Sequence, residues 1–331
     1  MPEKSPAASV APWRQIQREN FTDWKKLLVF LNIDLTLGAQ CVIPQSHFPL
    51  NLPRRLAEKM EKGRLDDPLL RQFLPLVEEN APHPLFVTDP IADNASRKSP
   101  KLLHKYHGRA LLLCTSACAM HCRYCFRRHF DYETTDKFFQ EELALIAQDA
   151  SLTEILLSGG DPLSLGEQHL NHLMESLCAI PHVKRIRLHT RFPMGIPERI
   201  DDALLSMLAR CSKQIFFTIH CNHAREFDAL ILEMLKEVQK LGIPVLTQTV
   251  LLKGVNDNAQ TLKELCELLV DNGIMPYYLH QLDRVQGAAH FEVAEEEGIA
   301  LIKAIAAELP GYAVPKYVRE VPHMPNKMPI Q

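Results

Sequence analysis

Apolar and polar positions alternate in two ways along this chain, and the change between them falls near residue 100. From residue 109 onward, short β-branched apolar runs recur between longer stretches whose apolar residues repeat every three or four positions. The short runs are typical of buried strands, and the longer stretches are typical of amphipathic helices. The pattern predicts six strands, at residues 110–114, 154–158, 185–189, 214–220, 245–251 and 275–281.

Helical stretches separate these strands. Strands that alternate with helices indicate βαβ units and therefore a parallel sheet. Six such units predict an α/β fold, an incomplete (β/α)6 barrel whose ligands bind at the carboxyl ends of the strands. A doubly wound sheet fits the same periodicity and stays open as an alternative. The predicted helices are residues 137–148, 166–179, 198–209, 224–241, 259–272 and, after the sixth strand, 294–308.

The first hundred residues are different, because polar residues and prolines interrupt every apolar pattern. Short helical patterns appear at 21–32, 53–62 and 68–78, and four prolines between residues 80 and 100 predict an irregular wrap or linker. The sequence therefore divides into an N-terminal helical extension (1–100), a barrel (101–310) and a short C-terminal segment (311–331).

Charge and composition exclude some function classes. A net charge of -3 gives no indication of a nucleic-acid partner or of attraction to a membrane surface. No uncharged apolar run approaches the length of a membrane span, and the N-terminus has no apolar signal core. We therefore expect a cytoplasmic protein without a nucleic-acid or membrane partner.

Four of the nine cysteines fall between residues 114 and 125. In a reducing compartment such a group indicates metal ligation rather than disulfides. Cys114 lies inside a predicted strand, and Cys178 and Cys266 lie in apolar helical patterns, so we expect these three in the core.

Cys118, Cys122 and Cys125 form a CxxxCxxC motif just after the first predicted strand. Three thiolates hold three irons of a [4Fe–4S] cluster and leave the fourth iron open to a small chelator. The amino and carboxylate groups of S-adenosylmethionine (SAM) suit that position, and reduction of the cluster would then release a 5′-deoxyadenosyl radical. The alternative is a zinc site with Cys114, His121 or His129 as fourth ligand.

The cysteine motif and the Arg127-Arg128 pair that follows it resemble the lysine 2,3-aminomutase family of radical SAM enzymes. The resemblance extends from about residue 104 to residue 329. The N-terminal string WRQIQRENF and the short C-terminus look most like the EpmB branch, which makes β-lysine for attachment to translation elongation factor P. Further matching strings are LSGGDPL (157–163), TRFP (190–193), HCNH (220–223), QTVLLKGVND (248–257), PYYLHQLD (276–283) and NKMP (326–329).

This resemblance implies an isomerase that converts L-α-lysine to β-lysine. It also implies three cofactors, a [4Fe–4S] cluster, SAM and pyridoxal 5′-phosphate (PLP), and a functional link to elongation factor P and its lysyl ligase. Lys327 matches the lysine that forms the Schiff base with PLP. Lys105, Tyr106 and Arg109 match the residues that bind the PLP phosphate, with Lys105 in place of the usual arginine.

Three further residues match the substrate site of the family. Arg127 matches the arginine that pairs with the substrate α-carboxylate, a group that suits a planar guanidinium. Asp283 and Glu320 match two acids that receive the ε-ammonium of lysine. Glu320 replaces an aspartate, so we expect its longer side chain to shift the preferred substrate length or to weaken affinity for free lysine. A free-lysine catabolic enzyme and a sibling glutamate 2,3-aminomutase are the alternatives, and Asp283 argues against glutamate.

The remaining candidates lie at strand ends. Ser158, Gly159, Gly160 and Asp161 end the second predicted strand, where glycines allow the backbone to approach a ligand closely. The equivalent family segment contacts the amino group of SAM. Contacts with SAM or PLP are also expected from His220, Asn222 and Gln248.

Overall fold

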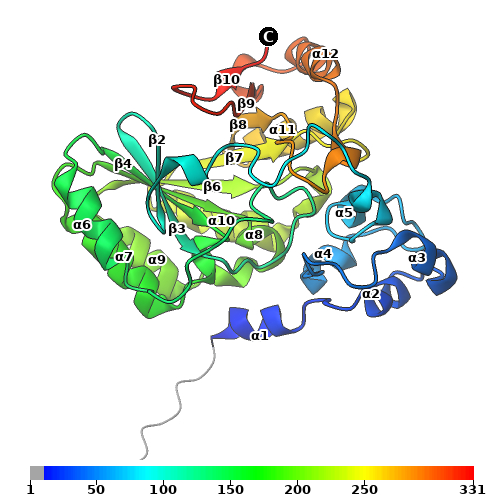
Figure 1. Ribbon diagram of the computed structural model, residues 1–331, viewed down its shortest axis with the longest axis horizontal. Coiled ribbons are helices and arrows are strands. Elements are labelled where there is room, and N and C mark those ends of the chain that lie inside the picture. The colour runs from blue at the N-terminus through cyan, green and yellow to red at the C-terminus, as the bar shows by residue number, and fades with distance from the viewer. Residues whose placement is uncertain (1–10) are drawn as a thin grey trace, which may run out of the picture.

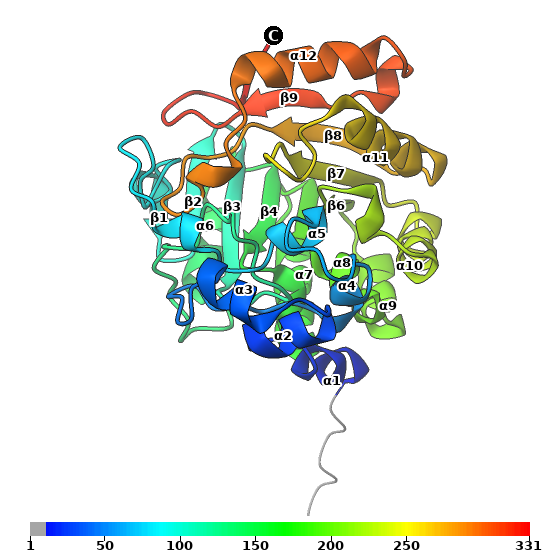
Figure 2. The ribbon, with the colours of Figure 1, turned by 90° about the vertical axis from the view of Figure 1, so that its right-hand side faces the viewer.

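The computed structural model describes residues 11–331. Its centre is a ten-stranded sheet in which the strands lie side by side in the order of the sequence (Figure 2). A doubly wound sheet reverses its strand order at a switch point, and no reversal occurs among these strands. The sheet is therefore wound in one direction, as an incomplete barrel. The residues before position 11, where the sequence predicts no signal core, lie outside the described part.

All six predicted strands are present, each within one residue of its expected bounds. Every neighbouring pair among them is parallel, as βαβ units require. Their carboxyl ends therefore meet along one edge of the sheet. The strands are β3 (Arg109–Thr115), β4 (Glu154–Gly159), β5 (Arg185–Thr190), β6 (Gln214–His220), β7 (Val245–Val250) and β8 (Met275–His280).

Four strands extend the sheet beyond the predicted six. On one side, β2 (Leu102–Tyr106) pairs antiparallel with β3, and β1 (Arg97–Ser99) pairs antiparallel with β2. On the other side, β9 (Lys316–Arg319) lies parallel to β8, and β10 (Met328–Pro329) returns antiparallel to β9. These strands have two to five residues, too few for an alternating pattern to stand out in the sequence.

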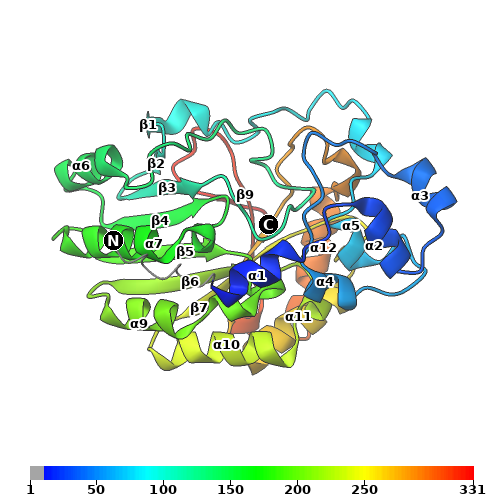
Figure 3. The same ribbon diagram turned by 90° about the horizontal axis from the view of Figure 1, so that it is seen from below.

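The six predicted helices cover the outer side of the sheet (Figure 3). Two of them begin four or five residues later than expected, because aspartates cap them: the side chain of Asp201 accepts from Leu204 N, and that of Asp228 accepts from Ile231 N. No helix within residues 11–331 combines the length and apolar character that a membrane crossing requires. The helices are α6 (Gln140–Gln148), α7 (Glu167–Ala179), α9 (Asp202–Arg210), α10 (Ala229–Lys240), α11 (Ala259–Asp271) and α12 (Glu295–Ala306).

The N-terminal extension forms short helices on another side of the molecule from α6 and α7 (Figure 1). The three predicted there are present but shorter, and α1 and α3 were not predicted. Trp13 packs edge-on against Phe192 of a short helix that follows β5, α8 (Phe192–Gly195). The extension is therefore part of the main core. Its helices are α1 (Pro12–Arg18), α2 (Trp24–Phe30), α3 (Leu35–Cys41), α4 (Arg54–Glu58) and α5 (Pro68–Arg71).

Two of the three cysteines expected in the core are there. Cys114 and Cys266 are buried. The prediction for Cys178 was wrong, because its side chain is only half-buried at the end of α7 and its Sγ lies 2.8 Å from Sγ of Cys211.

Candidate active site

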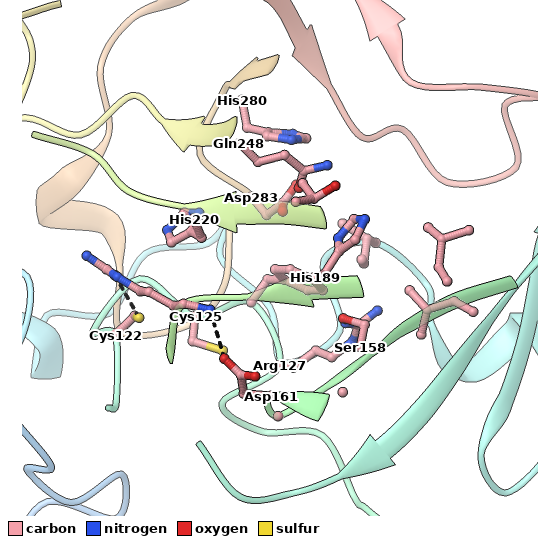
Figure 4. A pocket seen from close by; sticks show the side chains of 18 of the residues that line it. Cys122, Cys125, Arg127, Ser158, Asp161, His189, His220, Gln248, His280 and Asp283 are labelled. Carbon is pink, nitrogen blue, oxygen red and sulfur yellow. Dashed lines mark hydrogen bonds between the residues drawn. The ribbon is translucent and has the colours of Figure 1, made fainter. Parts of the chain in front are cut away.

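A cavity of about 620 Å³ opens at the carboxyl ends of the parallel strands. Cys118, Cys122 and Cys125 line it from the loop after β3, and Lys327 lines it from the C-terminal segment. Figure 4 shows side chains from several strands that point into this space. Every predicted site residue except Asn222 lies in its wall.

The cysteine loop is held by the N-terminal extension. Asn20 Nδ2 donates to the carbonyl of Ala119 at 2.8 Å, and the His121 amide donates to the carbonyl of Asn51 at 2.9 Å. Burial raises the pKa of Cys118 well above its ordinary value and that of Cys125 to about 11. The irons of a cluster would stabilise the thiolate forms that bind metal.

The donors considered for a zinc site have other partners. Cys114 donates to the carbonyl of Leu112 within β3, His121 Nδ1 lies 2.9 Å from the carbonyl of Pro49, and His129 Nε2 lies 3.1 Å from that of Gln286. Within residues 11–331 no three His, Cys, Asp or Glu side chains converge on one point. Ligands of a cubane cluster bind different irons and need no such convergence. The occupied donors favour the cluster.

A buried arginine that the sequence analysis missed supports this end of the cavity. Arg191 follows β5, and its Nη1 donates to Sγ of Cys122 at 2.8 Å. Its Nη2 donates to Glu226 at 2.9 Å and to Gln72 at 2.7 Å. Its position in the TRFP string was the only sequence signal for it.

The two glycines at the end of β4 are required by the cysteine loop itself. Gly159 has a φ of 111°, and a Cβ on Gly160 would lie 2.3 Å from the carbonyl oxygen of Ala117. The close approach expected for a ligand is thus made to the protein backbone. The Asp161 carboxylate is also committed, since it accepts from the Thr190 hydroxyl and the Arg191 amide, both at 2.8 Å. Burial raises its pKa to about 6.

Elsewhere in the cavity wall, Lys327 is paired with an acid. Its Nζ lies 2.6 Å from Oε2 of Glu320, and the Tyr106 hydroxyl donates to the other oxygen of that carboxylate. Nearby, the Arg109 guanidinium lies 4.7 Å above the Tyr106 ring and forms no ion pair with the described residues. Lys105, Tyr106 and Arg109 thus share one wall, where cations suit a phosphate.

A second missed residue, Asp93, connects two of the predicted ones. Its carboxylate is 1% exposed and lies 2.7 Å from both Arg127 Nε and Lys105 Nζ. Burial opposes its ionisation, but the two cations outweigh this and lower the pKa of Asp93. It comes from the segment expected to be an irregular wrap, so no pattern marked it.

Asp283 has no side-chain partner among the described residues, although it lines the cavity. Burial raises its pKa to about 7. The Nε2 atoms of His189 and His280, which line the same cavity, are buried without a hydrogen-bond partner. Burial lowers the pKa of both histidines well below its ordinary value, so they are neutral. Unpaired buried polar atoms of this kind fit a polar ligand.

The predicted ligand contact of Asn222 does not agree with its position. The side chain is fully buried behind the cavity wall. Its Nδ2 donates to Tyr124 at 2.6 Å and Gln72 at 3.0 Å, and its Oδ1 accepts from the Val250 amide at 2.9 Å. Asn222 therefore supports the wall. His220 does reach the cavity, and its Nε2 lies 2.8 Å from the Tyr124 hydroxyl.

Comparisons with known proteins agree with this geometry. Residues 112–269 match the family model of the radical SAM superfamily. An L-lysine 2,3-aminomutase from Escherichia coli (strain K12) is 45% identical, covering 93% of this chain and 91% of the relative. Proteins of the same name from Haemophilus influenzae and Buchnera aphidicola are 39% and 38% identical, over 95% and 86% of this chain and 94% and 85% of the relatives.

Proposed function

Because the chain belongs to the L-lysine 2,3-aminomutase family of radical SAM enzymes, we propose that it moves the α-amino group of L-lysine to the β-carbon. The chain is an isomerase that uses a [4Fe–4S] cluster, SAM and PLP. The observation that carries the proposal is a single cavity whose wall contains both the three cysteines and Lys327. One substrate molecule in this cavity can therefore react both with the radical formed at the cluster and with PLP.

In this proposal Cys118, Cys122 and Cys125 hold three cluster irons, and Lys327 holds PLP. When bound, the cluster with SAM supplies a radical initiator, and PLP supplies a carbonyl that carries nitrogen and delocalises an unpaired electron. Ser158, Gly159, Gly160, His220 and Gln248 form the wall proposed for SAM and PLP.

The substrate is held at two charged ends. The Arg127 guanidinium suits the α-carboxylate of the substrate. Asp93 binds its Nε, and its terminal nitrogens face Ser158 and the cavity. Asp283 suits the ε-ammonium, because its carboxylate has no partner among the described residues. Holding both ends orients the substrate carbons between the two cofactors.

Charge argues against a glutamate aminomutase. Glutamate would bring a second carboxylate toward the acid at position 283, where burial has already raised the pKa to about 7. A lysine ammonium at that place offsets the cost of ionising Asp283. A free-lysine catabolic enzyme would use the same site, so that alternative concerns the fate of the product.

We propose that the β-lysine product is used in the cytoplasm by the lysyl ligase that modifies elongation factor P. This part rests on the resemblance to the EpmB branch. In the same proposal the extension (1–100), the barrel (101–310) and the terminal segment (311–331) act as one catalytic unit. Asp93 of the extension and Lys327 of the terminal segment both line the cavity of the barrel.

Anaerobic turnover tests the proposal directly. Reconstituted protein is incubated with L-lysine, SAM, PLP and a strong reductant, and the products are separated by chiral chromatography. We expect β-lysine from the wild type and none from Lys327→Ala. Conversion of glutamate, or no amino acid product from lysine, would contradict the assignment.

A further inference from the structure

Cys178 and Cys211 form a pair of thiols that the proposed function does not use. Their Sγ atoms lie 2.8 Å apart, although 33 positions separate the two residues along the chain. Both are free, half-buried cysteines, and neither lines the cavity. We propose that this pair is a site of reversible disulfide formation, and that its oxidant is a small disulfide such as oxidised glutathione.

The fold brings the two cysteines together through contacts other than those of the sulfurs. Cys178 is the last residue but one of α7, Cys211 directly follows α9, and these two helices lie side by side (Figure 1). Strands β5 and β6, which follow the two cysteines, pair from their first residues onward. Lys213 Nζ also donates to the carbonyl of Ile180 at 3.0 Å, which ties the segment after α9 to the end of α7. The backbone therefore holds the two thiols together without a covalent bond.

Two neighbouring thiols can share a metal ion or be oxidised to a disulfide. A structural metal such as zinc takes four ligands, and within residues 11–331 no third His, Cys, Asp or Glu joins this pair to hold a metal ion. A disulfide needs no further residue. The distance of 2.8 Å leaves less than about 1 Å to close before an S–S bond of about 2.05 Å forms. The pair is therefore suited to a disulfide.

The oxidation proceeds by thiol–disulfide exchange in two steps, of which Cys178 performs the first. Burial, and then a hydrogen bond with Cys178, raise the pKa of Cys211 to about 12, so that Cys211 keeps its proton at this stage. The Cys178 thiolate attacks one sulfur of oxidised glutathione and releases one glutathione thiolate. Cys211 then gives up its proton and attacks the Cys178 sulfur of this mixed disulfide, which forms the protein S–S bond and releases the second glutathione. Two electrons pass from the protein to glutathione, and the two thiol protons end on the two glutathione molecules.

The bond would close a loop that contains β5, α8 and α9. This loop also contains Arg191, whose guanidinium donates to Sγ of Cys122 in the cavity wall. Closing a loop stabilises a fold mainly because it restricts the unfolded chain. The disulfide would therefore fasten the barrel unit that contacts a cluster cysteine, and would add no group to the cavity. Under reducing conditions the pair stays as two thiols.

The test exposes enzyme prepared without oxygen, with its cluster in place, to defined mixtures of oxidised and reduced glutathione. Free thiols are blocked with N-ethylmaleimide, and the peptides of a digest are identified by mass spectrometry without prior reduction. We expect a peptide that links Cys178 to Cys211, whose amount increases with the share of oxidised glutathione. It should disappear when the same sample is returned to reduced glutathione.

Three variants separate the two steps of the exchange. Cys211→Ser should stop after the first step and retain glutathione on Cys178, whereas Cys178→Ser should form no linked peptide. Cys41→Ser is the matched control, because Cys41 is also a half-buried free cysteine, and it should form the linked peptide as the wild type does. Oxidation should raise the melting temperature of the wild type and of Cys41→Ser by about 5 °C, and should leave that of the other two variants unchanged.

Three results would overturn the inference. The first is the absence of the linked peptide from folded wild-type enzyme in an excess of oxidised glutathione. The second is a linked peptide that persists in reduced glutathione, and the third is a linked peptide that leaves the melting temperature of the wild type unchanged. Failure to convert lysine would bear only on the proposed function, because these measurements are made without substrate.

Discussion

Replacement of Asp283 by asparagine tests whether this carboxylate binds the substrate ammonium. Burial raises its pKa to about 7, and only the ionised form attracts a cation. Below that pKa the Asp283 carboxyl must lose its proton before it can bind the lysine ammonium. The affinity of the wild-type protein for lysine should therefore rise as the pH rises through 7. At pH 6 about one tenth of the carboxyl groups are ionised and at pH 8 about nine tenths, which predicts a difference of about ninefold.

The assay is a titration of PLP-loaded, cluster-free protein with L-lysine at pH 6, 7 and 8, followed by PLP absorbance. Asp283→Asn keeps the size of the side chain but cannot ionise. Loss of a charged hydrogen bond costs about 1.5–3 kcal/mol, so its affinity at pH 8 should fall roughly 10- to 150-fold. Proton equilibria of lysine and PLP are common to both proteins, so only the wild type should show the extra pH dependence.

The reasoning is refuted if Asp283→Asn binds lysine as tightly as wild type at pH 8. It is also refuted if the lysine affinity of Asp283→Asn changes with pH as steeply as that of the wild type, because the group that titrates would then not be Asp283.

Three further changes test other parts of the account. Cys125→Ser should lose the iron and the visible absorbance of the reconstituted cluster, whereas Cys266→Ser, which changes a buried cysteine outside the cavity, should retain both. Arg127→Lys should raise the KM for lysine about tenfold, since a point charge replaces a planar fork, and unchanged lysine kinetics would disprove that contact. Glu79→Gln should lower the free energy of unfolding by about 3–5 kcal/mol in urea titrations, because Glu79 pairs in the interior with Arg123 and Arg128, and an unaltered midpoint would refute this.

The sequence was most informative where a periodic pattern had room to repeat. The six barrel strands and their helices each span several residues, so all of them were predicted, and the strand bounds were predicted within one residue. The terminal hairpin could not be predicted, because β10 has two residues and its pairing depends on β9 having already joined β8. Helix starts at Asp202 and Ala229 were missed by four or five residues, because a single capping aspartate decides them.

The residues that line the cavity were predictable to the extent that a motif contains them. The cysteines, Arg127, Asp283 and Lys327 all belong to strings with a recognisable spacing. Asp93 and the partner of Lys327 were not accessible in this way, because each depends on contacts between segments far apart in the chain. Asn222 shows the opposite error, in which a polar residue at a strand end supports the wall instead of facing the ligand.

The central claim is that the cysteines and Lys327, which line one cavity, act on the same lysine molecule. Its most direct test is anaerobic turnover of L-lysine carrying deuterium at the β-carbon, followed by mass analysis of SAM and of the amino acids. The account predicts β-lysine together with deuterium in the 5′-methylene group of recovered SAM. Cleavage of SAM that leaves deuterium in unchanged lysine, with no β-lysine formed, would contradict it.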